Sequence, residues 1–124
     1  MVRRSGAALT LPRRERLRRA ADIQALFQRG KREESTSFVA LWRVDQPGRA
    51  AGFAVSRQLR GAVDRNRARR RLREAYRHHQ AALPHGVQVV FIARPAALTR
   101  PFRDLLGEME RTVGALARAG RSSS

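Results

Sequence analysis

Arginine side chains are concentrated in one stretch of the sequence, DRNRARRRLREAYR, from Asp64 to Arg77. At about 100° per residue, a helix over this stretch carries polar residues at i, i+4, i+7 and i+11 on one side. They are Asn66, Arg70, Arg73 and Arg77, with Arg67 beside them and Arg65, Arg69 and Arg71 on the flanks. One guanidinium can donate to two oxygens of a phosphate at once, so this side predicts phosphate binding.

The opposite side of the same stretch is apolar and predicts packing against a sheet. Its members fall within about a quarter-turn and are Ala68, Leu72, Ala75 and Tyr76. Only Asp64 and Glu74 offset the arginines, and like charges four residues apart each cost a few tenths of a kcal/mol. Because the pattern weakens an isolated helix, it favours a polyanionic partner over a merely solvated face.

Acidic and histidine side chains do not form a pattern that predicts catalysis. Glu33 and Glu34 fit the charge of an edge strand, and Asp104 and Glu108 fit a solvated helix face that pairs with Arg111. The histidines have no spacing typical of metal ligands: His78, His79 and His85. Two-metal nuclease sites need several converging carboxylates, so we expect neither a metal site nor catalytic residues in this chain.

The totals narrow the class of protein. The chain has 124 residues, enough for one domain, and 42% of them are hydrophobic. Its net charge of +17 favours nucleic acid as the partner, with an anionic membrane surface as the next candidate. It has no cysteine, which removes disulfides and fits a cytoplasmic location. No apolar run approaches the roughly 18 residues that a spanning helix needs, so we expect no membrane insertion.

The chain divides into a basic arm, one folded domain and a short tail. Residues 1–16 are expected to be a disordered basic arm, because Pro12 and the arginine run discourage a helix. Residues 17–119 are expected to form a single domain that binds nucleic acid, and residues 120–124, GRSSS, are expected to be a disordered tail.

The first half of the domain predicts a helix and then strands. Residues 18–30 carry Ile23, Leu26 and Phe27 at helical spacing and end in Gly30, which suits the C′ position. Residues 37–44 and 50–56 are rich in strand formers, and a Gln-Pro-Gly turn separates them, so we expect two antiparallel strands. A further short edge strand fits residues 31–35.

The second half predicts a long helix, a strand and a helix. The arginine stretch lies in the helix expected over residues 62–83, which Pro84 would end. Residues 87–93 are almost continuously apolar and predict a buried strand, after which Thr99 could cap a last helix. The order helix, three strands, helix, strand, helix predicts an α+β two-layer sandwich with a four-stranded mixed sheet.

The segment GFAVSRQLRGAVDRNRARRRLREAYR, residues 52–77, resembles the hallmark of the bacterial ribonuclease P protein family. There a V-S-[KR] strand end leads through A-V into R-N-R-x-[KR]-R-x-x-R-E-[AS]-[FY]-R. The flanks are similar too, because LRRAADIQALFQRGK looks like the family's first helix and VVFIAR like its fourth strand. The resemblance covers about residues 15–118 in one colinear block.

The resemblance implies a left-handed crossover through the arginine helix, whereas ordinary crossovers in sheets are right-handed. It implies that this helix binds the catalytic RNA subunit of ribonuclease P through Arg65, Asn66, Arg67, Arg69, Arg70, Arg73 and Arg77. It also implies an accessory role in the endonucleolytic removal of the 5′ leader from precursor tRNA in the cytoplasm. The RNA would do the chemistry with Mg²⁺ that is bound mainly by the RNA subunit and the substrate.

A cleft between the first helix and the sheet is implied to take the precursor tRNA leader. The residues at the corresponding positions are Ile23, Phe27, Leu41, Trp42, Ser56 and Arg57. Ile23 stands where the family often has an aromatic residue. Leu41 and Trp42 alternate between opposite faces of a strand, so either could face the cleft, depending on the register.

Two other functions share the basic helix. A small ribosomal or RNA-assembly protein would have the same charge but no dependence on a leader. A DNA-binding regulator would place the helix in a major groove, but a strand rather than a helix precedes Gly61, so a helix-turn-helix is not indicated. Neither a membrane nor a small-molecule substrate is expected as a partner.

Overall fold

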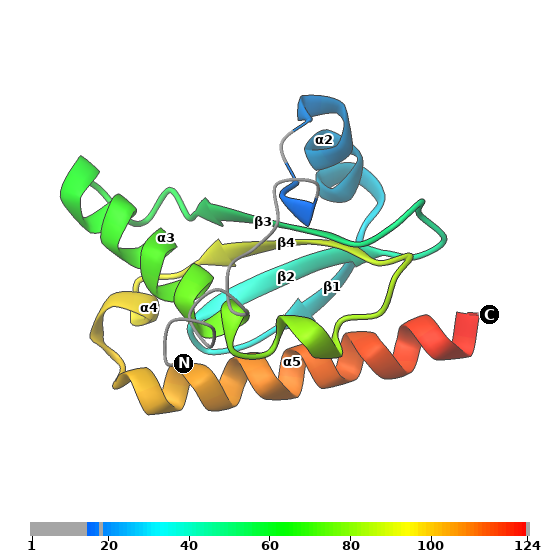
Figure 1. Cartoon of the computed structure of the whole chain (residues 1–124). Helices are drawn as coiled ribbons and strands as arrows, with labels where there is room; N and C mark the ends of the chain where they lie inside the picture. Colours follow the sequence, from blue (N-terminus) through cyan, green and yellow to red (C-terminus); the bar gives the residue numbers. More distant parts are fainter. Residues whose placement is uncertain (1–14, 18, 124) are drawn as a thin grey trace, which may run out of the picture.

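A computed structural model describes residues 15–17 and 19–123 of the chain (Figure 1). The elements are α2 (Ala20–Arg29), β1 (Lys31–Glu34), β2 (Phe38–Arg43), β3 (Ala50–Val55), α3 (Ala62–Arg77), the 3₁₀ helix η2 (Gln80–Ala82), β4 (Gln88–Ala93), α4 (Ala96–Thr99) and α5 (Phe102–Ser123). The predicted order of one helix, three strands, helix, strand and helix is confirmed, with η2 and α4 as additional short turns.

The four strands form one mixed sheet in the order β1-β2-β4-β3. Strand β2 is antiparallel to both β1 and β4, whereas β3 and β4 are parallel and joined through α3. Strands β2 and β3 therefore run antiparallel, as predicted, but β4 lies between them. The side chains of β4 are apolar on both faces because helices cover both sides of the sheet there. The left-handed sense of the β3–α3–β4 crossover stays a prediction.

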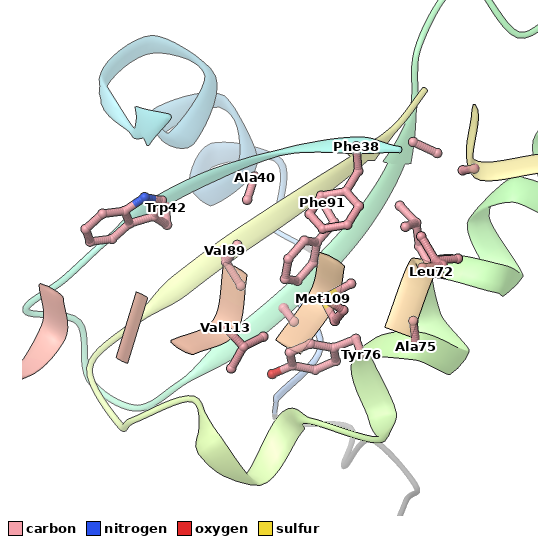
Figure 2. Packing of buried hydrophobic residues seen from close by; sticks show 14 of the residues in the cluster. Phe38, Ala40, Trp42, Leu72, Ala75, Tyr76, Val89, Phe91, Met109 and Val113 are labelled. Carbon is pink, nitrogen blue, oxygen red and sulfur yellow. The ribbon is translucent and has the colours of Figure 1, made fainter. Parts of the chain in front are cut away.

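Helices cover both faces of the sheet, with α3 and α5 on one side and α2 on the other (Figure 1). Alternation along β2 sends Phe38 and Trp42 to the α5 side and Val39 and Leu41 to the α2 side. On the α5 side, Phe91 lies at the centre of an aromatic group, and Figure 2 shows it beside Phe38 and above the helices. This packing fixes α3 against the sheet through its apolar side.

The predicted apolar side of α3 is confirmed, but the predicted end of the helix is wrong. Ala68, Leu72, Ala75 and Tyr76 are all buried, and Figure 2 shows the last three of these facing the core. The helix ends at Arg77 instead of residue 83. Beyond this end the chain forms η2, and Arg49 from the β2–β3 connection donates to the main-chain oxygens of Gln80 and Leu83 (3.2 and 2.9 Å).

Both ends of α5 differ from the prediction. Thr99 closes α4 and does not cap α5; the carbonyl of Pro101 accepts the first main-chain hydrogen bonds, from Asp104 and Leu105. At the other end, α5 continues through Ser123. Residues 120–123, which were expected to belong to a disordered tail, are therefore helical. A Cβ on Gly120 would lie 3.1 Å from Pro84, which shows that the helix is still packed on the domain there.

The described part of the chain begins before residue 17, where the domain was expected to start. The carboxylate of Glu15 is buried and accepts a hydrogen bond from Arg49 (3.1 Å), and Leu17 donates to the carbonyl of Ala51 on β3 (2.9 Å). Arg16 forms an isolated parallel bridge with Ala51. Residues 15–17 therefore belong to the folded domain, and residues 1–14 of the predicted arm lie outside the described residues.

Candidate RNA interface

The outer side of α3 carries a basic concavity. It has a volume of about 390 Å³ and is lined by Asn66, Arg69, Arg70 and Arg73. The side-chain oxygen of Asn66 accepts a hydrogen bond from Arg69 (3.1 Å), which orients one guanidinium along the rim. We call these four residues, together with the exposed Arg67, the arginine face. The concavity brings together four of the seven residues predicted to bind the RNA subunit, and Arg67 is exposed on the same helix.

The two other predicted residues of this set have protein partners. Arg65 donates to the main-chain oxygens of Ser56 and Leu59 (3.1 and 2.8 Å), which ties the start of α3 to the β3–α3 connection. Arg77 pairs with Glu74 at 3.1 Å and is half-buried. Both positions stay predictions as RNA contacts, but their guanidinium groups also hold the fold.

Arg71 shows why the helix needs an arginine away from the arginine face. Its guanidinium donates to the carbonyl oxygens of Ala97 (2.7 Å) and Arg100, which lie at the end of α4. The same group lies 5.8 Å from the ring centre of Phe102. Arg71 therefore joins α3 to the α4–α5 corner. The sequence had placed Arg71 only on the flank of the helix.

A second concavity lies on the α2 side of the sheet, where β3 and β4 end. It has a volume of about 280 Å³ and is lined by Arg32, Val39, Ser56, Gln58, Ile92 and Arg94. We call it the sheet-end cleft. Its floor is the directly paired Val39 and Ile92, and the sheet register places Glu34 beside Val39. A single-stranded nucleic acid could lie across this apolar floor between basic side chains.

Of the six predicted leader residues, only Ser56 lines this cleft. Arg57 is exposed next to Ser56, and Phe27 on α2 is 54% exposed. Ile23 is partly covered, and Leu41 is only 6% exposed because α2 packs over it. Val39 is as deeply buried as Leu41, but the concavity is lined by Val39 and the partly exposed Ile92 and not by Leu41.

Trp42 is wrong as a residue of the cleft. It packs in the core cluster on the α5 side, with Lys31 lying 5.3 Å from the centre of its ring. Leu41 lies on the other face of the sheet, where it packs in one cluster with Leu26 of α2. Arg32, Val39, Gln58, Ile92 and Arg94 were missed, although the alternation from Leu41 to Val39 and the basic end of the VVFIAR strand could have indicated them.

The described residues contain neither a candidate metal cluster nor a candidate membrane span. Within residues 15–17 and 19–123, no three histidine, aspartate or glutamate side chains come together as a candidate metal site. In the same part of the chain, no helix has the length and apolar character needed to cross a bilayer.

Known proteins share both the sequence pattern and the fold. The family model described as Ribonuclease P matches residues 11–117. The ribonuclease P protein component of Acidothermus cellulolyticus is 40% identical over 115 residues, which cover 90% of this chain and 96% of that protein. The component from Gluconacetobacter diazotrophicus is 38% identical over 104 residues, or 82% and 90% of the two chains.

The fold agrees with solved structures as well. The ribonuclease P protein from Thermotoga maritima matches with a TM-score of 0.70 and 26% identity, over 82% of this chain and 96% of that one. The Staphylococcus aureus protein has the same fold, with a TM-score of 0.68. Since the family model spans most of the sequence, the chain belongs to the ribonuclease P protein family.

Proposed function

We propose that this chain binds the RNA subunit of ribonuclease P through the arginine face and the 5′ leader of precursor tRNA through the sheet-end cleft. In this role it assists the Mg²⁺-dependent removal of the leader in the cytoplasm. The observation that carries the proposal is the pair of concavities, one on the outer side of α3 and one on the α2 side of the sheet. One protein could therefore hold two RNA strands at once.

The arginine face suits a structured RNA. Its guanidinium groups are carried by a helix whose opposite side is packed in the core, so the backbone positions that carry them are fixed before binding. Prior ordering lowers the entropy that binding must overcome. Arg73 also lies 5.7 Å from the ring centre of Phe53, which limits its motion further.

The sheet-end cleft suits a single strand. An apolar floor of Val39 and Ile92 can contact the face of a base, while Arg32 and Arg94 at the rim can contact phosphates. The exposed ring of Phe27 on α2 offers a stacking surface near the same face of the sheet. Ser56 and Gln58 supply polar groups at the end of β3.

We assign the chemistry to the RNA subunit. Mg²⁺ retains several waters and binds phosphate oxygens readily, and both RNA partners supply such oxygens. The contribution of the protein is electrostatic, since a leader and a structured RNA repel each other and a domain of charge +17 between them reduces that repulsion. The protein thus raises precursor affinity and lowers the Mg²⁺ requirement.

The proposal is tested with the reconstituted holoenzyme. We expect the holoenzyme to bind precursor tRNA more tightly than mature tRNA, and the protein alone to leave labelled precursor intact with Mg²⁺ present. Equal affinities for the two tRNAs would favour a general RNA-assembly protein. Clean 5′ maturation without the RNA subunit would place the chemistry in the protein and refute the assignment.

A further inference from the structure

Three charged side chains meet at the rim of the sheet-end cleft. The Nε of Arg32 donates to one carboxylate oxygen of Glu34 at 2.8 Å, and Nη2 of Arg94 donates to the other oxygen at 2.9 Å. Glu34 is therefore held between two arginines that both line the cleft.

The strand register explains why this group faces the cleft. Arg32 and Glu34 are two residues apart on β1, so their side chains leave the same face of the sheet. They lie directly opposite Leu41 and Val39, which are the β2 residues on the α2 side. The intervening Glu33 lies opposite Ala40, whose side chain belongs to the core on the other face.

Arg94 is fixed in place from the other side. Its Nη1 donates to the main-chain oxygen of Ser35 at 2.7 Å, and its main-chain N–H donates to the carbonyl of Ser37. The β1–β2 connection therefore holds Arg94 at the end of β4, whether or not Glu34 is in contact with it.

We propose that Arg32 and Arg94 form a binding site for one phosphodiester of the leader, and that Glu34 occupies this site until the phosphate displaces it. A carboxylate and a phosphodiester carry the same charge and both offer two oxygens to guanidinium donors. The side chain of Glu34 is 54% exposed, so it can turn into solvent at little cost. This inference rests on the proposed leader role of the cleft.

Protons do not release Glu34 near neutral pH. The hydrogen bonds from Arg32 and Arg94 hold the pKa of the Glu34 carboxyl below its usual value, so the carboxylate stays charged. Only another anion can take its place. Glu34 thereby lowers the affinity of the cleft for every RNA strand, and a strand that places a phosphate at this site over the Val39–Ile92 floor regains that affinity.

The test compares Glu34→Gln with Glu33→Gln in the reconstituted holoenzyme. Both variants remove one negative charge from β1, but only Glu34 contacts the cleft arginines. We expect Glu34→Gln to tighten precursor tRNA binding roughly threefold to tenfold and to leave mature tRNA binding unchanged. Glu33→Gln should change neither affinity. Equal effects of the two variants would mean that only net charge matters and would overturn the proposal.

A second measurement identifies the phosphate. A single neutral methylphosphonate linkage is moved along the leader of the precursor. At one position of this linkage, Glu34→Gln should no longer tighten precursor binding relative to wild type. Adding Arg32→Gln to Glu34→Gln should likewise remove the gain. If no linkage has this effect, the phosphodiester site is refuted. If the wild-type holoenzyme does not distinguish precursor from mature tRNA, it is the leader role of the cleft that fails.

Discussion

Glu108 on α5 is only 3% exposed and joins three separate segments of the chain. Its carboxylate accepts hydrogen bonds from the hydroxyl of Ser35 and from both the N–H and the hydroxyl of Ser37. Nε of Arg100 lies 3.0 Å from its second oxygen. Burial acts to raise the pKa of Glu108, but the serine hydrogen bonds and Arg100 outweigh it and hold this pKa below its ordinary value of 4.5.

Replacing Glu108 by Gln should lower the free energy of unfolding by about 2–3 kcal/mol at pH 7, because buried donors lose a charged acceptor. A lowered pKa in the folded state stabilises the fold above the ordinary pKa, and this contribution is lost as the pH falls through the folded-state value. The gap between wild type and variant should therefore shrink below pH 4.5. Urea unfolding at several pH values measures it.

The matched control is Glu110→Gln, which removes the same charge from an exposed position on the same helix. It should change stability by less than about 0.5 kcal/mol at every pH. A Glu108→Gln variant as stable as this control at pH 7 would contradict the role of the buried carboxylate.

The sequence misled us at Glu108 for a physical reason. Local spacing placed it on a solvated face with Arg111, but its serine partners precede it by more than 70 residues. Spacing along a helix predicts only neighbours on that helix. Arg65 is a similar case, since its carbonyl partners follow from how the β3–α3 connection folds back.

At the scale of elements, the apolar side of α3 was predicted correctly, because the helical period alone determines which residues share that side. Its apolar residues had to lie together, and they form part of the core. The period did not show where the helix ends, and the residues that follow it are bonded to Arg49, which comes from another segment. The position of β4 between β2 and β3 is likewise a result of pairing between distant segments.

Reversing the charge of two arginine-face residues, Arg67→Glu with Arg70→Glu, should abolish assembly with the RNA subunit. The expected loss of affinity is roughly a hundredfold or more, because two phosphate contacts become repulsive. Both side chains are exposed, so the free energy of unfolding should stay within about 1 kcal/mol of wild type. Titration of the labelled RNA subunit and thermal unfolding give the two readouts.

The control is Arg103→Glu with Arg111→Glu, which makes the same change of charge at exposed positions of α5. It should weaken assembly far less than the change on α3. If the α3 variant assembles normally, the arginine face does not bind the RNA subunit.

At the scale of the whole molecule, the question is whether the charge of +17 acts as a diffuse field or through placed contacts. A diffuse field attracts RNA from every side and speeds encounter. Placed contacts release a defined number of counterions for each phosphate that is bound. The fold favours the second case, since α3 holds its arginines in a fixed array while other arginines, such as Arg49 and Arg71, bind carbonyl groups of the protein.

The salt dependence of RNA-subunit binding distinguishes the two cases. Four arginines on the arginine face predict that log K falls with log salt at a slope of about −3 to −4. Neutralising two of them, Arg67→Gln with Arg70→Gln, should reduce the steepness by roughly 1.5 to 2, because two counterions are no longer released. Neutralising Arg103 and Arg111 lowers the net charge equally and should leave the slope unchanged. Equal loss of slope in both variants would show that net charge, and not its placement on α3, governs binding.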